Sequence, residues 1–112
     1  MNMFLKSVAL AAAALSTIGS AQAFDAAAAK SLAAKNACLA CHAVDQKVVG
    51  PSYKAVAAKY QGQADALEKV AARIQSGGSG VYGLVPMPAQ PNLTNDELKL
   101  LAAWVLAGAP DK

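Results

Sequence analysis

The sequence predicts a small all-α protein built from about four short helices. Stretches with helical capping residues or with the apolar spacing of one helical face recur along it. No window alternates apolar and polar residues in the way that a half-buried strand does. Segments rich in glycine and proline separate the helical stretches, and such segments are typical of loops.

The first two helices are predicted on either side of Gly50–Pro51. Asp25 can cap a first helix that continues to about Asn36 through an alanine-rich body of high helix propensity. Ser52 resembles the N-cap of a second helix, which ends at Gln61–Gly62–Gln63. Its apolar residues follow the i, i+3, i+4, i+7 spacing of one helical face, at Tyr53, Val56, Ala57 and Tyr60.

Two further helices flank a long irregular segment. The third shows the same spacing, and Asp65 and Lys69 form a plausible i,i+4 pair in it. Val85–Pro88 must be irregular, because two prolines lack backbone donors and restrict φ. Thr94–Glu97 reads as a capping box that opens the last helix, and Gly108 and Pro110 end it. The apolar residues of these two helices are Leu67, Val70, Ala71 and Ile74, and Leu98, Leu101, Trp104 and Val105.

The segment Cys38–His42 has the pattern Cys-x-x-Cys-His, which is an attachment site for c-type haem. Each thiol can add to one haem vinyl group, and one helical turn places both sulfurs along the same porphyrin edge. His42 follows directly and can bind the iron as the proximal ligand. After residue 23 the chain holds one other candidate ligand, because Met87 is its only methionine and no second histidine exists.

Other interpretations of these residues are less well supported. Cys38 and Cys41 would also suit a thioredoxin-like pair or a disulfide, but no βαβ pattern surrounds them. Zinc would need a third and a fourth Cys or His ligand, which the chain lacks. Met87 would also suit an ordinary core position, but a methionine between two prolines is a poor core filler. An enzyme or gas sensor would require an open sixth position on the iron, whereas Met87 predicts an electron carrier.

The first 23 residues have the features of a secretory signal peptide. Lys6 precedes a short apolar run, Val8–Ile18, and Ala21–Ala23 fits a cleavage site after Ala23. The run is too short to span a bilayer of ~30 Å comfortably. We therefore expect one domain, residues 24–112, exported to the periplasm and without stable membrane insertion. Loss of Lys6 lowers the formal charge from +3 to +2, and no basic run predicts nucleic-acid binding.

Residues 24–112 resemble the small class I cytochromes c of bacterial periplasms, the cytochrome c-551 type. The resemblance lies in CLACHAVDQKVVGPSYKAVAAKY, GVYGLVPMP and LAAWVLAG, and in the spacing between them. It implies the cytochrome c fold, with short helices wrapped around one covalently attached haem. It also implies a monomeric carrier of single electrons rather than an enzyme. A cytochrome bc1-type complex would be its donor, and a terminal oxidase, nitrite reductase or peroxidase its acceptor.

The resemblance also implies roles for individual residues. Cys38 and Cys41 match the haem-linking cysteines, and His42 and Met87 match the axial ligands. Pro51 matches a proline whose carbonyl accepts a hydrogen bond from the histidine. The remaining haem-pocket positions are the propionate donors Arg73 and Tyr82, the aromatic Trp104, and Gln90 or Asn92 as the donor to the methionine sulfur. Relatives often have a bulky aromatic before the first cysteine, where this chain has Ala33 and Ala34.

Overall fold

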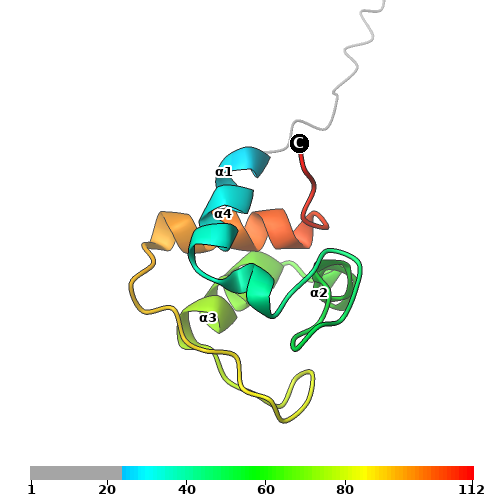
Figure 1. The fold of residues 1–112 in the computed structure, drawn as a ribbon. Helices are drawn as coiled ribbons and strands as arrows, with labels where there is room; N and C mark the ends of the chain where they lie inside the picture. The colour runs from blue at the N-terminus through cyan, green and yellow to red at the C-terminus, as the bar shows by residue number, and fades with distance from the viewer. Residues whose placement is uncertain (1–23) are drawn as a thin grey trace, which may run out of the picture.

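The computed structural model describes residues 24–112, and the predicted signal peptide, residues 1–23, lies outside the described residues. The helices are α1 (Ala26–Lys35), the 3-10 turn η1 (Cys38–Ala40), α2 (Tyr53–Tyr60), α3 (Ala66–Ser76) and α4 (Asn95–Leu106) (Figure 1). Within residues 24–112 no strand forms, and two isolated β-bridges are the only extended pairings. The all-α prediction is confirmed.

Side-chain caps begin three of the helices where the sequence predicts them. The Asp25 carboxylate accepts a hydrogen bond from the Ala28 amide at 3.0 Å, and the Ser52 hydroxyl accepts one from the Ala55 amide at 3.0 Å. Thr94 and Glu97 form the predicted capping box that opens α4. These bonds satisfy amides that have no partner within the helix.

Helix α4 is the centre of the fold, because α1, α2 and α3 all pack against it. Its Leu101 and Trp104 are each 2% exposed and form the middle of the core. Helix α1 crosses α4 in Figure 1 and buries three alanines there: Ala26, Ala29 and Ala33. This crossing forms without a bulky aromatic before the first cysteine, since small side chains let the two helices approach closely.

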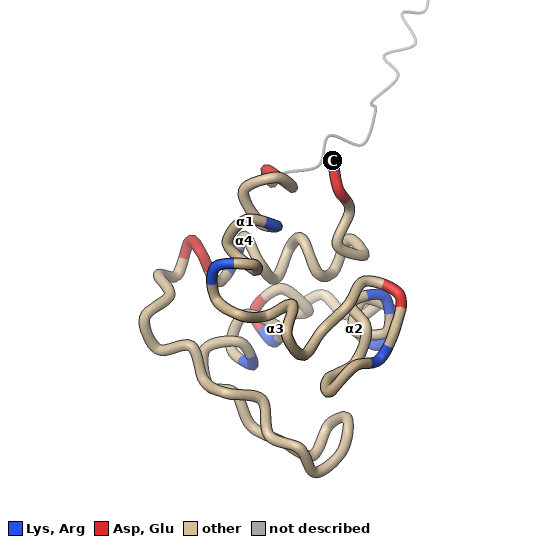
Figure 2. Tube along the Cα trace, in the orientation of Figure 1, with Lys and Arg blue, Asp and Glu red and all other residues tan. Residues whose placement is uncertain are grey.

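Charged side chains are distributed unevenly over the fold (Figure 2). They lie on or next to the helices, on the loop that precedes α2 and in the C-terminal segment, while the long loop between α3 and α4 has none. That loop also exposes large apolar side chains, including Leu84 and Val85. Among the helices of residues 24–112, none is both long and apolar enough to cross a bilayer.

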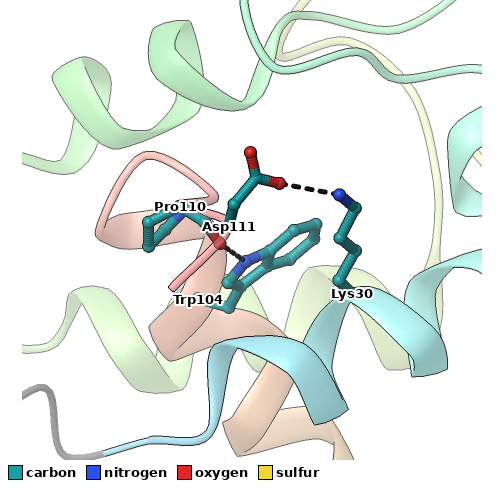
Figure 3. Close-up of polar contacts among 4 residues, drawn as sticks. All are labelled: Lys30, Trp104, Pro110 and Asp111. Carbon is teal, nitrogen blue, oxygen red and sulfur yellow. Dashed lines mark hydrogen bonds and ion pairs between the residues drawn. The ribbon is translucent and has the colours of Figure 1, made fainter.

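The residues after α4 fold back over its last turn (Figure 3). Gly108 and Ala109 have positive φ angles of 89° and 55°, and the Ala109 amide donates to the Trp104 carbonyl at 2.9 Å. The Trp104 indole Nε1–H donates to the Pro110 carbonyl at 2.9 Å. Next to it, Asp111 Oδ1 lies 2.7 Å from Lys30 Nζ, which links this segment to α1.

Candidate haem-binding site

A mostly apolar cleft is bordered by η1, the loop before α2, α2, α3, the loop after α3 and α4. Cys38, Cys41 and His42 border it from one segment of the chain, and Met87 borders it from the long loop. The structure therefore brings the four residues with the predicted haem chemistry to one cleft. Pro51, Arg73, Tyr82 and Trp104 also border this cleft.

The two cysteines are held by the short turn that the motif predicts. The amides of Cys41 and His42 both donate to the Cys38 carbonyl, at 3.2 and 3.0 Å. Both cysteines are half-buried and form no disulfide, and the Cys38 thiol donates to the Asn36 carbonyl at 3.9 Å. Burial is the main reason why the pKa of the Cys38 thiol is raised, and the nearby Cys41 adds to the effect. A raised thiol pKa does not suit a thioredoxin-like nucleophile, which depends on the thiolate.

The His42 ring is held from three directions. Its Nδ1 lies 2.7 Å from the Pro51 carbonyl oxygen, and because a carbonyl only accepts, Nδ1 carries the proton. Nε2 is then the nitrogen with a free lone pair, as a metal ligand requires. A Cβ on Gly50 would lie 2.6 Å from His42 Cε1, so only glycine fits beside the ring. On another side the Tyr53 ring stacks on it, with centroids 5.3 Å apart and planes at 20°.

Tyr53 connects the His42 ring to the core. Its ring centroid lies 5.2 Å from that of Trp104 with the planes tilted by 60°, a favourable arrangement for two aromatic rings. Tyr53 is 4% exposed, and burial raises the pKa of its hydroxyl far above the usual range. The hydroxyl therefore stays protonated, and the ring acts as a neutral packing surface.

Met87 lies in an irregular segment that is bonded to the end of α3. The Met87 amide donates to the Gly78 carbonyl at 2.9 Å, and the Gly78 amide donates to the Met87 carbonyl at 3.0 Å. The side chain is partly buried and packs against the core cluster. The predicted irregular conformation is present, and this pair of bonds fixes it to α3.

The other predicted pocket residues differ in their surroundings. Arg73 Nη1 donates to the Gly77 carbonyl at 3.2 Å, so Arg73 secures the end of α3. Tyr82 is 42% exposed, and Lys59 Nζ lies 5.6 Å from the centroid of its ring. Gln90 and Asn92 lie outside the residues that border the cleft. Gln90 is bonded through its backbone amide to the Gln75 carbonyl at 3.1 Å, whereas Asn92 is exposed.

Sequence reasoning missed three contacts around the site. The packing of Gly50 on His42, the stacking of Tyr53 on the same ring and the approach of Gly77 to the Met87 backbone all appear only in the structure. The contact of Gly50 with His42 could have been suspected from the sequence, because a glycine stands directly before Pro51. The other two depend on how separate segments pack together, which spacing along the chain does not reveal.

The donor set fits haem. Two thiols on one turn, an imidazole with a free Nε2 and a thioether border one apolar cleft, and these are the groups that a c-type haem uses. Within residues 24–112, no group of three or more His, Cys, Asp or Glu side chains is placed to hold a metal ion directly. The site therefore suits iron within a porphyrin rather than a bare metal ion.

Comparisons with known proteins agree with this chemistry. The cytochrome c family model matches residues 26–109. A cytochrome c-552 of Nitrosomonas europaea is 49% identical over 96 residues, which span 86% of this chain and 88% of that protein. A cytochrome c-551 of Pseudomonas aeruginosa is 55% identical over 71 residues, 62% of this chain and 66% of that protein. The crystal structure of the wild-type Nitrosomonas europaea cytochrome c552 superposes with a TM-score of 0.68 at 47% identity, covering 70% of this chain and 98% of that one.

The chain belongs to the cytochrome c family, and its relatives are small class I cytochromes. It is an electron carrier with a covalently attached haem c, and it is not an enzyme. The four α-helices of residues 24–112 form the cytochrome c fold, so the predicted fold, family and cofactor are confirmed.

Proposed function

We propose that the protein is a periplasmic one-electron carrier whose haem iron is ligated by His42 and Met87, with thioether links at Cys38 and Cys41. The main support is that these four side chains border one cleft. Downstream of residue 23 the chain has no other histidine, cysteine or methionine. When bound, haem supplies a one-electron ferrous/ferric couple.

The surrounding residues orient the ligands and exclude water. The Pro51 carbonyl accepts a hydrogen bond from the His42 Nδ1–H, which makes His42 Nε2 the better lone-pair donor to a metal. Met87 offers a neutral, polarisable sulfur, and a neutral ligand in an apolar cleft favours the state of lower charge. With His42 and Met87 both binding the iron, a small molecule would find no open site on the metal. This arrangement suits electron transfer.

We also propose that residues 1–23 direct export and are removed after Ala23. The Ala21–Ala23 sequence supports cleavage at this point, and the capped start of α1 follows it closely at Asp25. Bacteria attach c-type haem outside the cytoplasm, and this agrees with export of the chain. The mature domain is then residues 24–112, acting as a monomer in the periplasm.

The surface around the cleft suits brief contacts with redox proteins. Val48, Val49 and Val85 are 52%, 50% and 65% exposed, and Lys47, Val49 and Val85 border the cleft. A small apolar centre with nearby charges is typical of transient interfaces. We propose a cytochrome bc1-type donor, and a terminal oxidase, nitrite reductase or peroxidase as acceptor.

The ligand assignment is tested with Met87→Ala. Ferric iron bound by a thioether gives a weak red absorption band, and we expect this band to disappear in the variant while the mass still shows covalent haem. The potential should fall, because a ligand that favours ferrous iron is lost. Leu84→Ala, on the same loop at a position that is 93% exposed, is the control and should keep the band. A band that persists in Met87→Ala would show that another group is the sixth ligand.

A further inference from the structure

We propose that Gly77 is a positioning residue for Met87. Its missing side chain lets the end of α3 lie directly against the Met87 backbone, and this contact sets where the Met87 sulfur is held in the cleft. The inference rests on the proposed function, in which Met87 is the sixth ligand.

Backbone hydrogen bonds join the end of α3 to the Met87 segment. Gly78 and Met87 exchange two bonds, at 2.9 and 3.0 Å, and the Gln90 amide donates to the Gln75 carbonyl at 3.1 Å. Pro86 and Pro88 have no amide hydrogen, so the Met87 N–H is the only donor of these three residues. The Met87 N–H donates to the Gly78 carbonyl, so the residues just after α3 are the main support of this segment.

Gly77 lies inside this contact and is buried. A Cβ built on it would lie 2.3 Å from the Met87 carbonyl oxygen, 2.7 Å from the Ala89 amide nitrogen and 2.8 Å from the Pro88 carbonyl carbon. All three are backbone atoms, which cannot rotate away as the end of a flexible side chain can. Any larger residue at position 77 must therefore move the Met87 segment or the end of α3.

The end of α3 is itself fixed. The Gly77 amide donates to the Arg73 carbonyl at 2.7 Å, and Arg73 Nη1 donates to the Gly77 carbonyl at 3.2 Å. These bonds hold Gly77 as the C-cap of α3, a helix that packs on α4. The Met87 segment has fewer supports, so we expect an added Cβ to displace Met87 rather than α3.

Gly62 provides a matched control. Its φ of 80° resembles the 63° of Gly77, and L-residues are strained at both angles. A Cβ on Gly62 would meet no atom within 4 Å, and Gly62 does not border the cleft. Alanine at position 62 therefore places an L-residue at a positive φ, as Gly77→Ala does, but without the contact to the Met87 segment.

The test compares Gly77→Ala and Gly62→Ala as purified haem proteins. We expect Gly77→Ala to weaken or lose the red thioether band and to bind added imidazole at least roughly tenfold more tightly, because the sixth position is more often open. Gly62→Ala should keep the band and the imidazole affinity of the unaltered protein. In a Met87→Ala background, Gly77→Ala should leave imidazole affinity unchanged, since its effect acts through Met87.

Several results would overturn the inference. One is a Gly77→Ala protein that keeps both the band and the imidazole affinity of Gly62→Ala. Another is an equal gain in affinity with and without Met87. If Gly77→Ala gives folded protein with covalent haem only when imidazole is present, the inference is supported. If it gives no folded haem protein even with imidazole, the inference is contradicted. A band that is absent from the unaltered protein, or that persists in Met87→Ala, would instead refute the proposed ligand.

Discussion

Tyr53 is the residue whose importance changes most between sequence and structure. Its spacing in the helical pattern predicts a core position, and the side chain is indeed buried. The structure adds that its ring lies between His42 and Trp104, so that it links the proposed iron ligand to α4. A helical pattern shows which face is buried, but it does not show which ring from another segment will meet that face.

We expect the contribution of Tyr53 to come from its ring rather than from its hydroxyl. Tyr53→Ala should lower the free energy of unfolding by about 3–5 kcal/mol, as truncation of a large buried aromatic does. Tyr53→Phe should cost less than about 1 kcal/mol, because both ring contacts remain. Guanidinium denaturation of the haem protein, followed by circular dichroism, measures both values. Equal losses in the two variants would contradict the role of the ring.

At the scale of the elements, helix starts were predictable because they depend on local sequence. Asp25, Ser52 and the Thr94–Glu97 box all cap the helices that the sequence assigns to them. The packing of α1 was less predictable, since its three buried alanines resemble ordinary helix-forming residues. The hydrogen bond from Trp104 to Pro110 also had no local signal, because it depends on the chain reversing after Gly108.

The link between α1 and the C-terminal segment should depend on pH. The hydrogen bond and charge of Lys30 lower the pKa of the Asp111 carboxyl below its usual 3.8. A carboxyl whose pKa is lower in the folded state stabilises the fold above that usual value, and the contribution is lost as the pH falls through the folded pKa. Both side chains are exposed, so the effect should be small and screened by salt.

Asp111→Asn should therefore be slightly less stable than the unaltered protein near neutral pH. The difference should vanish below the folded pKa of Asp111 and should shrink in high salt. Thermal unfolding across a pH series measures it. A loss of stability in Asp111→Asn that is equal at neutral and strongly acidic pH would show that the carboxylate charge is not responsible.

At the scale of the whole molecule, the structure separates the lysines that could face a redox partner. Lys35, Lys47, Lys54 and Lys59 lie in or near the segments around the haem-binding motif. Lys54 forms an ion pair with Asp45, and Lys59 lies over the Tyr82 ring. Lys47 borders the cleft and forms no ion pair within residues 24–112, so it is the lysine best placed to steer a partner. Sequence alone did not separate these lysines, because their partners lie in other segments.

We predict that Lys47→Glu slows electron transfer to an acidic partner with little change in potential. Charge steering is screened over ~10 Å at 0.1 M salt, so the deficit should shrink as ionic strength rises. Val48→Lys, which places a charge in the apolar centre, should slow transfer at every ionic strength. Stopped-flow kinetics with an acidic redox protein test both variants. Unchanged rates in both variants would show that electrons leave the protein through another face.

The central claim is that residues 24–112 hold one covalent haem with two protein ligands on its iron. The most direct measurement combines an intact mass with an optical spectrum of the protein purified from the periplasm. We predict the mass of residues 24–112 plus one haem, and a low-spin ferric spectrum with the thioether band. A mass without haem, or a high-spin spectrum that shows an open sixth position, would contradict the account.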